Sequence, residues 1–351
     1  MNKYHVMLMP GEGIGSEIVK EGMRVLGVVA DLYDLDLDVT DHVVGEAKFK
    51  QSGRYLSEET ERRCNELKTN PQAAILFGAV ADEPIGILRK QYNLFANLRP
   101  IRAFSQLKSV SPLRPERLNN VDILIVRELV SGIYYGERTQ GRDEQGRWAK
   151  QEMYYHELEV RRIVKRALSV ANKRRKRLHL VHKGNAIPEI FDIWLSVLKE
   201  EAQDYPEVKC HDILVDNMAM QMVLRPQNFD VLLCSNLFGD ILSDLGAGII
   251  GSIGLLPSAS LNEYGFGLFE SVGGTAPDIA GQQKANPLST ILSVAMMCRQ
   301  TFNHEKAART IESAVDEVLC KYRTVDIYEE GYELVSTTEM GSQVVAALKA
   351  R

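Results

Sequence analysis

The chain lacks the cysteine pattern of a disulfide framework or a zinc site. Its five cysteines are odd in number, widely scattered and without a CxxC pair (Cys64, Cys210, Cys234, Cys298 and Cys320). A secreted disulfide scaffold or a structural zinc site would show paired, closely spaced cysteines. The pattern therefore argues against both classes and fits a reducing compartment.

Membrane-crossing segments and a basic surface are also missing. No apolar run in the 351 residues approaches the length that crosses a bilayer. The first residues, MNKYHVMLMPGEGIG, lack the long apolar core and cleavage site of a signal peptide. The net charge of −5 gives no electrostatic case for nucleic acid, and we interpret the one basic block, Lys173–Arg177 (KRRKR), as a solvated helix end. We expect a cytoplasmic protein without nucleic-acid or membrane partners.

The usual dinucleotide-binding motif is incomplete. Gly11, Gly13 and Gly15 follow an apolar run, but their spacing is GxGxG rather than GxGxxG. The acidic residue expected at the end of a second strand is not clear either. A tight turn from a strand into a helix explains these glycines without a ligand.

What the chain does contain is an alternation of short apolar runs with helical patterns, which indicates an α/β protein. Its length suits two domains. The expected strands are 5–9, 73–77, 122–126, 178–181 and 230–234, and the expected helices include 16–30, 188–201 and 241–245. Gly132–Tyr155 places aromatic residues on both sides of a Gly-rich polar centre, which predicts a β-hairpin arm. Glu305–Leu348 predicts two helices with a polar connector.

The most informative segment is Asn236–Leu245, NLFGDILSDL. Asp240 and Asp244 stand four residues apart behind a Phe-Gly break. If the stretch after Gly239 is helical, both carboxylates lie on one face. Without a basic partner they would repel unless a cation lay between them, and hard oxygen ligands suit Mg²⁺ or Mn²⁺. Two solvated acids in the first turn of a helix would give the same pattern.

Three arginines lie in apolar or turn settings: Arg89 in ILRK, Arg99 in FANLRP and Arg127 in LIVREL. Arg127 ends an expected buried strand, and a buried guanidinium needs an anion, which it grips with a bidentate fork. Arg99 precedes Pro100 and therefore lies in an extended segment. Together they suggest a small di- or tricarboxylate ligand, although each alone would fit a structural salt bridge.

Three further residues are candidates for proton transfer or metal binding. Lys183 closes an apolar run, where a depressed pKa would let it act as a base. Tyr134 in SGIYYG is a candidate proton donor, and an arm tyrosine at an interface would look the same. Asp216 in LVDNMAM could complete a metal site with Asp240 and Asp244, or could serve as a helix N-cap.

These segments resemble the β-decarboxylating dehydrogenases of (2R)-hydroxy acids, the 3-isopropylmalate and isocitrate dehydrogenase family. The resemblance covers nearly the whole chain. It includes PGEGIGSEIV, FANLRPIR, VDILIVREL with SGIYYGE, HKGNAI, DNMAMQMV, SNLFGDILSDLGAG, GSIGLLPSAS and GGTAPDIAGQQKANP. FANLRP, VREL–GIYYGE and GLLPSAS are most similar to the isopropylmalate branch. The resemblance implies NAD-dependent oxidative decarboxylation of (2R,3S)-3-isopropylmalate to 2-oxo-4-methylpentanoate and CO₂.

The resemblance also implies a role for each matching residue. Three arginines would bind the malate carboxylates (Arg89, Arg99 and Arg127). Asp240 and Asp244 would hold Mg²⁺ or Mn²⁺, with Asp216 reaching the same metal from a partner subunit. Lys183, also from that subunit, would take the hydroxyl proton while hydride leaves C2 for nicotinamide. Tyr134 would protonate the enol that remains after CO₂ departs.

The same resemblance implies the cofactor site, the domains and the assembly. The cofactor-binding positions are Glu270, Gly274, Thr275, Ala276, Asp278 and Asn286. Asp278 matches the acid that accepts the ribose 2′-hydroxyl, so NAD is expected over NADP. The implied fold has a large cofactor-binding domain (1–98 and 252–351) and a small domain (99–251) with the metal and substrate residues, the β-arm and a homodimer interface that shares the active sites.

The chain departs from the isopropylmalate pattern at several positions. The connection from Gly78 to Arg89 is short, Gly86 stands where a leucine is usual, and Ala186 stands where a valine is usual. Gly273 replaces a histidine and His182 an aspartate. Because Gly86 and Ala186 remove apolar volume beside the C3 substituent, a 3-substituted malate with a bulkier alkyl or benzyl group is the alternative substrate. A non-catalytic regulatory homologue is a further alternative, which the presence of all base, acid and metal positions disfavours.

Overall fold

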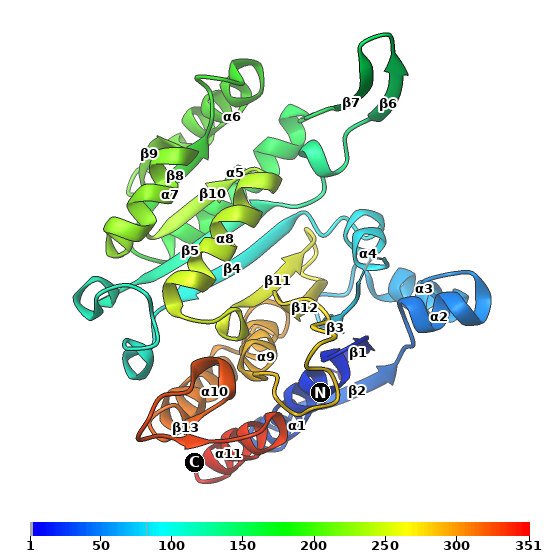
Figure 1. Ribbon diagram of the computed structural model, residues 1–351, viewed down its shortest axis with the longest axis vertical. Coiled ribbons are helices and arrows are strands. Elements are labelled where there is room, and N and C mark those ends of the chain that lie inside the picture. Colours follow the sequence, from blue (N-terminus) through cyan, green and yellow to red (C-terminus); the bar gives the residue numbers. More distant parts are fainter. Residues whose placement is uncertain (1–2, 82) are drawn as a thin grey trace. The chain divides into compact units, whose positions relative to one another are not determined.

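A computed structural model describes residues 3–81 and 83–351. The chain divides into two compact units (Figure 1). Unit 1 consists of Met1–Leu94, Ala103–Pro115 and Ala247–Arg351. Unit 2 consists of Phe95–Arg102 and Glu116–Gly246. Among the described residues, no helix combines the length and apolar character needed to cross a membrane.

Unit 1 contains a mostly parallel sheet with the strand order β2–β1–β3–β12–β11. Its strands are β1 (Lys3–Gly11), β2 (Asp36–Asp41), β3 (Ala73–Ala79), β11 (Pro257–Leu261) and β12 (Gly267–Ser271). Only the β11–β12 pair among these is antiparallel. Every residue of β3 is buried, because an interior parallel strand is covered on both faces.

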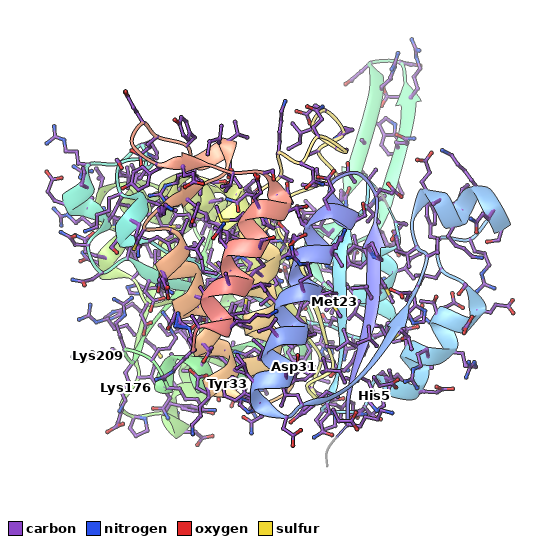
Figure 2. The ribbon with its side chains drawn as sticks, turned by 90° about the horizontal axis from the view of Figure 1, so that it is seen from below. His5, Met23, Asp31, Tyr33, Lys176 and Lys209 are labelled. Atoms are coloured by element: carbon purple, nitrogen blue, oxygen red, sulfur yellow. The ribbon has the colours of Figure 1, made fainter. Side chains whose placement is uncertain are left out.

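Helices cover this sheet and fix the parts that carry candidate site residues. The larger helices are α1 (Gly15–Tyr33), α9 (Leu288–Gln300), α10 (Glu305–Val318) and α11 (Thr337–Lys349). Helix α9 is buried from Leu288 to Cys298 because it packs on β11 and β12 and is covered by α1 and α10. Figure 2 shows α1 beside α11, with Asp31 and Tyr33 near its C-terminal end.

Three short helices complete this part of unit 1: α2 (Glu46–Ser52), α3 (Glu58–Leu67) and α4 (Ile85–Gln91). Helix α4 carries Arg89. Its Leu88 is fully buried in a cluster that also contains Phe77 and Phe266. This anchor holds the following residue, Arg89, at a defined place on unit 1.

Unit 2 has the strand order β4–β5–β10–β8–β9, with only β4 antiparallel to its neighbour. The strands are β4 (Ala96–Arg102), β5 (Asp122–Glu128), β8 (Arg177–His182), β9 (Lys209–Leu214) and β10 (Val231–Cys234). Its helices are α5 (Glu157–Asn172), α6 (Pro188–Glu201), α7 (Val215–Leu224) and α8 (Asn236–Ile250), which runs on into unit 1 from Ala247.

The predicted α/β class is confirmed, and so are the hairpin and the last two helices. Strands β6 (Arg138–Asp143) and β7 (Gly146–Gln151) pair antiparallel within the predicted arm. The prediction of a solvated helix end at Lys173–Arg177 is wrong for Arg174. Its Nε donates to Asp230 Oδ1 at 2.8 Å, and that carboxylate is fully buried, so the arginine compensates an interior charge.

Candidate active site

The two acids of the most informative segment lie on one helix. We expected a break at Phe238-Gly239, but α8 already begins at Asn236. Gly239 lies within the helix, where the side chain of Arg127 passes so closely that an added Cβ would be 2.6 Å from Arg127 Cγ. Asp240 and Asp244 share a face, as their spacing predicts. Arg99 Nη1 lies 3.2 Å from Asp240 Oδ1 and 3.9 Å from Asp244 Oδ1.

The premise that these acids lack a basic partner is wrong. Arg127 Nη1 donates to Asp240 Oδ1 at 2.6 Å, in addition to the contact from Arg99. Both arginines are almost completely buried, on strands β5 and β4, and each brings a positive charge that needs an anion. The neighbours come from strands far away in the sequence, so α8 alone does not reveal them. The result is a preformed group of opposed charges within unit 2.

Ser243 and Tyr134 add further contacts to this group. Arg99 Nη1 donates to Ser243 Oγ at 2.6 Å, and that hydroxyl donates to the carbonyl of Asp240 at 2.8 Å. Tyr134 donates its hydroxyl to Asp240 Oδ2 at 2.6 Å. Partial burial and the Asp240 carboxylate raise the pKa of Tyr134, which keeps the phenol protonated. A proton donor therefore stands beside two guanidinium groups.

Lys183 and Asp216 form a second pair in unit 2. Lys183 follows β8 and begins a turn, in which His182 Nδ1 accepts from the N–H of Gly184 at 3.2 Å. Lys183 Nζ lies 3.1 Å from Oδ2 of Asp216, which is in the first turn of α7. Asp216 is not the N-cap, which is Leu214. The hydrogen bond from Lys183 lowers the pKa of the Asp216 carboxyl, so this exposed acid is an anion at neutral pH.

The carboxylate oxygens of Asp240 and Asp244 suit a divalent cation, but they supply only part of its ligands. Asp240 and Asp244 present carboxylate oxygens from one helix face, which is the ligand type that Mg²⁺ and Mn²⁺ prefer. Partial burial raises the pKa of Asp244; Arg99 opposes this rise and Asp240 adds to it. Among the described residues, no group of three or more His, Cys, Asp or Glu side chains gathers within this single chain.

Arg89, the third candidate arginine, has a partner of its own in unit 1. Its Nη2 donates to Glu270 Oε1 at 2.7 Å, and Glu270 is nearly buried on β12. The structure thus pairs a candidate substrate residue with a candidate cofactor residue. Arg99 and Arg127 lie together in unit 2.

The candidate cofactor segment between β12 and α9 packs on the Gly turn after β1. Ile14 donates its N–H to the carbonyl of Thr275 at 2.9 Å. Gly13 has a φ of +56°, and an added Cβ would be 2.0 Å from the Thr275 carbonyl oxygen. Ala276 follows with a φ of +40°. The glycines therefore make a tight strand-to-helix turn, as interpreted, and this turn also supports the candidate cofactor segment.

The remaining cofactor candidates differ in how they are held. Gly274 and Asp278 are exposed, and in the described part of the chain no hydrogen bond or ion pair engages the Asp278 carboxylate. Asn286 is nearly buried and its amide is occupied at both ends. Its Nδ2 donates to Asp326 Oδ2 at 3.0 Å, and its Oδ1 accepts from the N–H of Leu288 at 3.0 Å. A ligand could thus reach Asp278 directly, whereas the Asn286 side chain fixes the start of α9.

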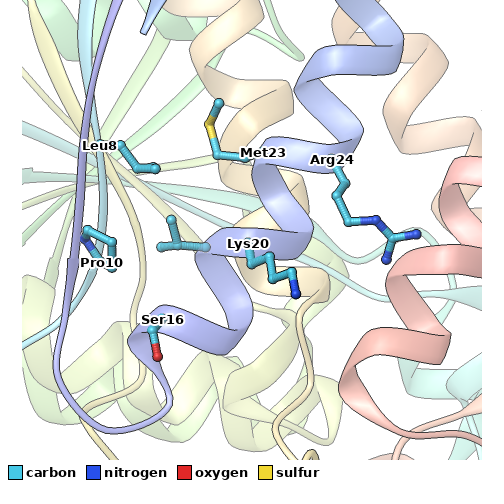
Figure 3. Close-up of a pocket in the computed structure, with 7 residues that line it drawn as sticks. Leu8, Pro10, Ser16, Lys20, Met23 and Arg24 are labelled. Atoms are coloured by element: carbon cyan, nitrogen blue, oxygen red, sulfur yellow. The ribbon is translucent and has the colours of Figure 1, made fainter. Parts of the chain in front are cut away.

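A cavity of about 400 Å³ opens in unit 1 between β1 and α1 (Figure 3). Apolar side chains make most of its wall, and its lining residues are Leu8, Pro10, Ser16, Val19, Lys20, Met23 and Arg24. Figure 3 shows the Arg24 side chain directed away from it, toward α11, where Arg24 Nη2 donates to Ser342 Oγ at 3.0 Å. The charged candidates of unit 2 take no part in this cavity.

Sequence reasoning missed several polar residues that hold the candidates. Asn236, Ser243 and Glu17 had no assigned role, although Ser243 stands three residues after Asp240 and could have been placed on its helix face. Glu17 accepts from the N–H of Gly281 and, at 3.3 Å, from Gln283 Nε2, so α1 fixes the candidate cofactor segment. No local signal marks Asn236 or Glu17, because their partners are distant in the sequence.

Comparisons with known proteins identify the family to which this chain is similar. Residues 5–344 match the family model described as isocitrate/isopropylmalate dehydrogenase. The 3-isopropylmalate dehydrogenase of Aquifex aeolicus is 41% identical over 99% of this chain and 98% of that protein. The enzyme of the same name from Hydrogenovibrio crunogenus is 44% identical over 98% and 99%. Among solved structures, isocitrate dehydrogenase from Methylococcus capsulatus gives a TM-score of 0.87 at 31% identity, covering 99% of both chains.

Proposed function

This chain belongs to the isocitrate/isopropylmalate dehydrogenase family of β-decarboxylating dehydrogenases, and we propose that it oxidises (2R,3S)-3-isopropylmalate with NAD to give 2-oxo-4-methylpentanoate and CO₂. Such a reaction would place it in leucine biosynthesis. The observation that carries the proposal is the group formed by Arg99, Arg127, Tyr134 and Asp240 in unit 2. It combines anion-binding guanidinium groups, a proton donor and a carboxylate in the way this chemistry requires.

The two buried arginines would bind the substrate carboxylates. Arg99 and Arg127 both contact the Asp240 carboxylate, and this shared contact with an anion supports the proposal. Arg89, on α4, would contribute a third guanidinium. Each guanidinium would attract the dianionic malate. Replacing any of the three arginines with a neutral residue should therefore lower the affinity for malate steeply.

Proton transfers would be divided between Lys183 and Tyr134. As hydride passes from C2 to the nicotinamide, Lys183 would take the proton of the C2 hydroxyl, which leaves a ketone. The C3–C4 bond then breaks, C4 departs as CO₂, and the electron pair of the broken bond forms an enolate with C2 and its oxygen. Tyr134, whose raised pKa keeps it protonated, would deliver a proton to C3.

Asp240 and Asp244 would hold Mg²⁺ or Mn²⁺ together with Asp216 of a second copy of the chain. When bound, such an ion polarises the C2 oxygen as a Lewis acid. The Lys183–Asp216 pair keeps the Asp216 carboxylate charged, which suits a metal ligand. Asp278 would accept the adenosine ribose 2′-hydroxyl of NAD, and its exposed carboxylate would repel the 2′-phosphate of NADP.

We propose a homodimer with shared active sites, in line with this division of ligands. Helix α7, which carries Asp216, also exposes the apolar side chains of Met220 and Leu224. A mixture of Lys183→Ala and Asp240→Asn chains tests the sharing. Each variant alone should be nearly inactive, and refolding the two together should restore up to about a quarter of the wild-type rate. Absence of recovery in a stable mixed dimer would reject shared sites.

The alternative substrate is a malate with a bulkier 3-alkyl or 3-benzyl group. Gly86 on α4 and Ala186 after Lys183 have little or no side chain where the family resemblance places larger apolar residues. An added Cβ at Gly86 would lie 3.1 Å from Glu83 Oε1, so a carboxylate borders the space that the missing side chain leaves. This carboxylate disfavours a purely apolar enlarged pocket and supports isopropylmalate as the first choice.

The proposed function is tested by kcat/KM for isopropylmalate and for benzylmalate with NAD and Mg²⁺. We expect at least a tenfold preference for isopropylmalate, and a preference for benzylmalate would establish the alternative. Turnover by the purified chain alone would also reject a regulatory role. The same assay with NADP should show a kcat/KM at least tenfold lower than with NAD.

A further inference from the structure

Asn236, the first residue of α8, is a buried polar residue that hydrogen-bonds to several residues of the candidate site and its surroundings. Only 1% of its surface is exposed. Its Oδ1 accepts from Arg127 Nη2 at 2.7 Å and from Arg127 Nε at 3.1 Å. Its Nδ2 donates to the carbonyls of Leu129 and Ser131, each at 3.0 Å. The oxygen of the side-chain amide therefore binds Arg127 on β5, and its nitrogen binds the segment that follows β5.

The contacts to Arg127 determine which way its guanidinium faces. Asn236 takes up the Nε and one Nη2 hydrogen at one edge of the planar group. Nη1, at the other side, donates to Asp240 Oδ1 at 2.6 Å. An arginine side chain has several rotatable bonds, so fixing one edge of the plane also fixes where the other edge points. Gly239, which lies against the Arg127 stem, restricts the chain further.

The donor end of the same amide holds the segment that leads to Tyr134. Leu129 and Ser131 lie between Arg127 and the short helix Gly132–Tyr134, and both carbonyls point to Asn236. The backbone N–H of Asn236 also donates to the buried Tyr155 hydroxyl at 2.9 Å. One residue thus links the arginine with the segment that carries the candidate proton donor.

An amide at this place has an advantage over a carboxylate. Aspartate would accept the same two hydrogen bonds from Arg127, but its negative charge would offset the guanidinium charge and weaken the attraction for a second anion. Asparagine holds the arginine without adding a second negative charge to that of the Asp240 carboxylate, which Arg127 already contacts. Aspartate would also lack the two hydrogens that now bond to the carbonyls of Leu129 and Ser131.

We propose that Asn236 is a positioning residue that orients Arg127 toward the substrate carboxylate and holds the Tyr134 segment, without adding a negative charge beside the arginine. The inference rests on the proposed function, because it assumes that Arg127 binds a malate carboxylate. It concerns a residue outside the candidate arginines, acids and proton donors. Its effect is exerted through Arg127 and Tyr134 and not through contact with substrate.

The test compares Asn236→Asp and Asn236→Ala with the wild type in steady-state kinetics at saturating Mg²⁺. For both variants we expect kcat to fall at least tenfold, because neither side chain can donate to the carbonyls of Leu129 and Ser131 and the Tyr134 segment loses this support. For Asn236→Asp we expect the KM for isopropylmalate also to rise at least tenfold, because the new charge offsets that of Arg127, with the KM for NAD within twofold. Val197→Ala, a buried change in α6 of the same unit, is the control for lost stability and should leave both KM values unchanged.

An unchanged KM for isopropylmalate in Asn236→Asp would overturn the proposal, as would equal rises in the KM of both substrates. If Asn236→Ala fails to fold, Asn236→Asp decides the question, because it keeps the volume and the Arg127 contact. Wild-type turnover is measured first. Its absence rejects the proposed substrate, whereas normal wild-type turnover with an unaffected Asn236→Asp rejects only the positioning role.

Discussion

Arg89 and Glu270 form an ion pair within unit 1, with Arg89 Nη2 2.7 Å from Glu270 Oε1. Helix α4 supplies the arginine and β12 the carboxylate. Only 16% of the arginine side chain and 6% of the glutamate side chain are exposed. A pair this poorly solvated is costly to break from one side, because the remaining charge stays buried without compensation. The pair also joins a candidate substrate residue to a candidate cofactor residue.

Glu270→Gln should therefore destabilise the protein by about 1–3 kcal/mol, measured by urea unfolding at pH 7. The amide keeps an acceptor for Arg89 but not the charge. Arg309→Gln breaks an exposed pair with Glu305 and is the control, for which we expect less than about 0.5 kcal/mol. Equal losses of unfolding free energy in the two variants would show that the buried Arg89–Glu270 pair stabilises the protein no more than the exposed pair does.

Gly13→Ala should weaken NAD binding with little effect on malate binding. At φ +56° and 2.0 Å from the Thr275 carbonyl oxygen, an added Cβ is both strained and too close to the candidate cofactor segment. We expect the KM for NAD to rise about tenfold and that for isopropylmalate to stay within twofold. Gly27→Ala, in α1 with no atom within 4 Å of the added Cβ, should leave both values unchanged and stabilise the helix by up to about 1 kcal/mol.

The sequence was sufficient for the fold class and for the interior strands, but not for every strand. Apolar runs marked β1, β3, β5, β8 and β10, which lie inside the two strand orders. The edge strands β2 (DLDVTD) and β9 (KCHDIL) were missed, because solvent on one side lets charged residues interrupt the apolar run. Segment β12 was missed because GLFES is short and contains Gly, Ser and Glu, although it is buried.

For the candidate site, the chemistry of single residues was easier to predict than their partners. Arg127 was identified because a strand-end guanidinium in an apolar run needs an anion. The identity of that anion, Asp240, depends on packing between β5 and α8, whose residues are over a hundred positions apart in the chain. Gly239 was misread as a helix break for the same reason. Gly239 leaves room for the Arg127 side chain, which packs against it, and does not mark a turn.

Asp244→Asn should separate metal binding from stability. The Asp244 side chain is 61% exposed and lies 3.9 Å from Arg99, so its contribution to folding is small. We expect a change in unfolding free energy below about 0.5 kcal/mol, together with at least a tenfold rise in the Mg²⁺ concentration needed for half-maximal activity. Asp240→Asn, which removes a carboxylate charge that two buried arginines contact, should reduce both stability and activity. An unchanged Mg²⁺ requirement in Asp244→Asn would contradict the proposed metal site.

The stability of the protein should fall as the pH rises from about 4.5 to about 7, because of Glu128. This carboxyl lies next to Arg127, is fully buried, and burial raises its pKa from 4.5 to about 7. The N–H groups of Val130 and Ser131 and the guanidinium of Arg162 oppose the rise, and Glu159 adds to it. Since the folded state holds the proton that the unfolded state releases in this interval, each step upward in pH favours unfolding.

Above pH 7 both states are ionised at this group, so its destabilising effect is complete and no longer changes. The full effect is at most about 3 kcal/mol, from 1.36 kcal/mol per pKa unit. Urea unfolding at pH 5.5 and pH 8 should show the wild type losing more stability between the two values than Glu128→Gln, which cannot ionise and retains an acceptor for the Ser131 N–H. Equal pH slopes in the two proteins would mean that Glu128 is already ionised in the folded state at pH 5.5 and that Arg162 and the backbone donors outweigh its burial.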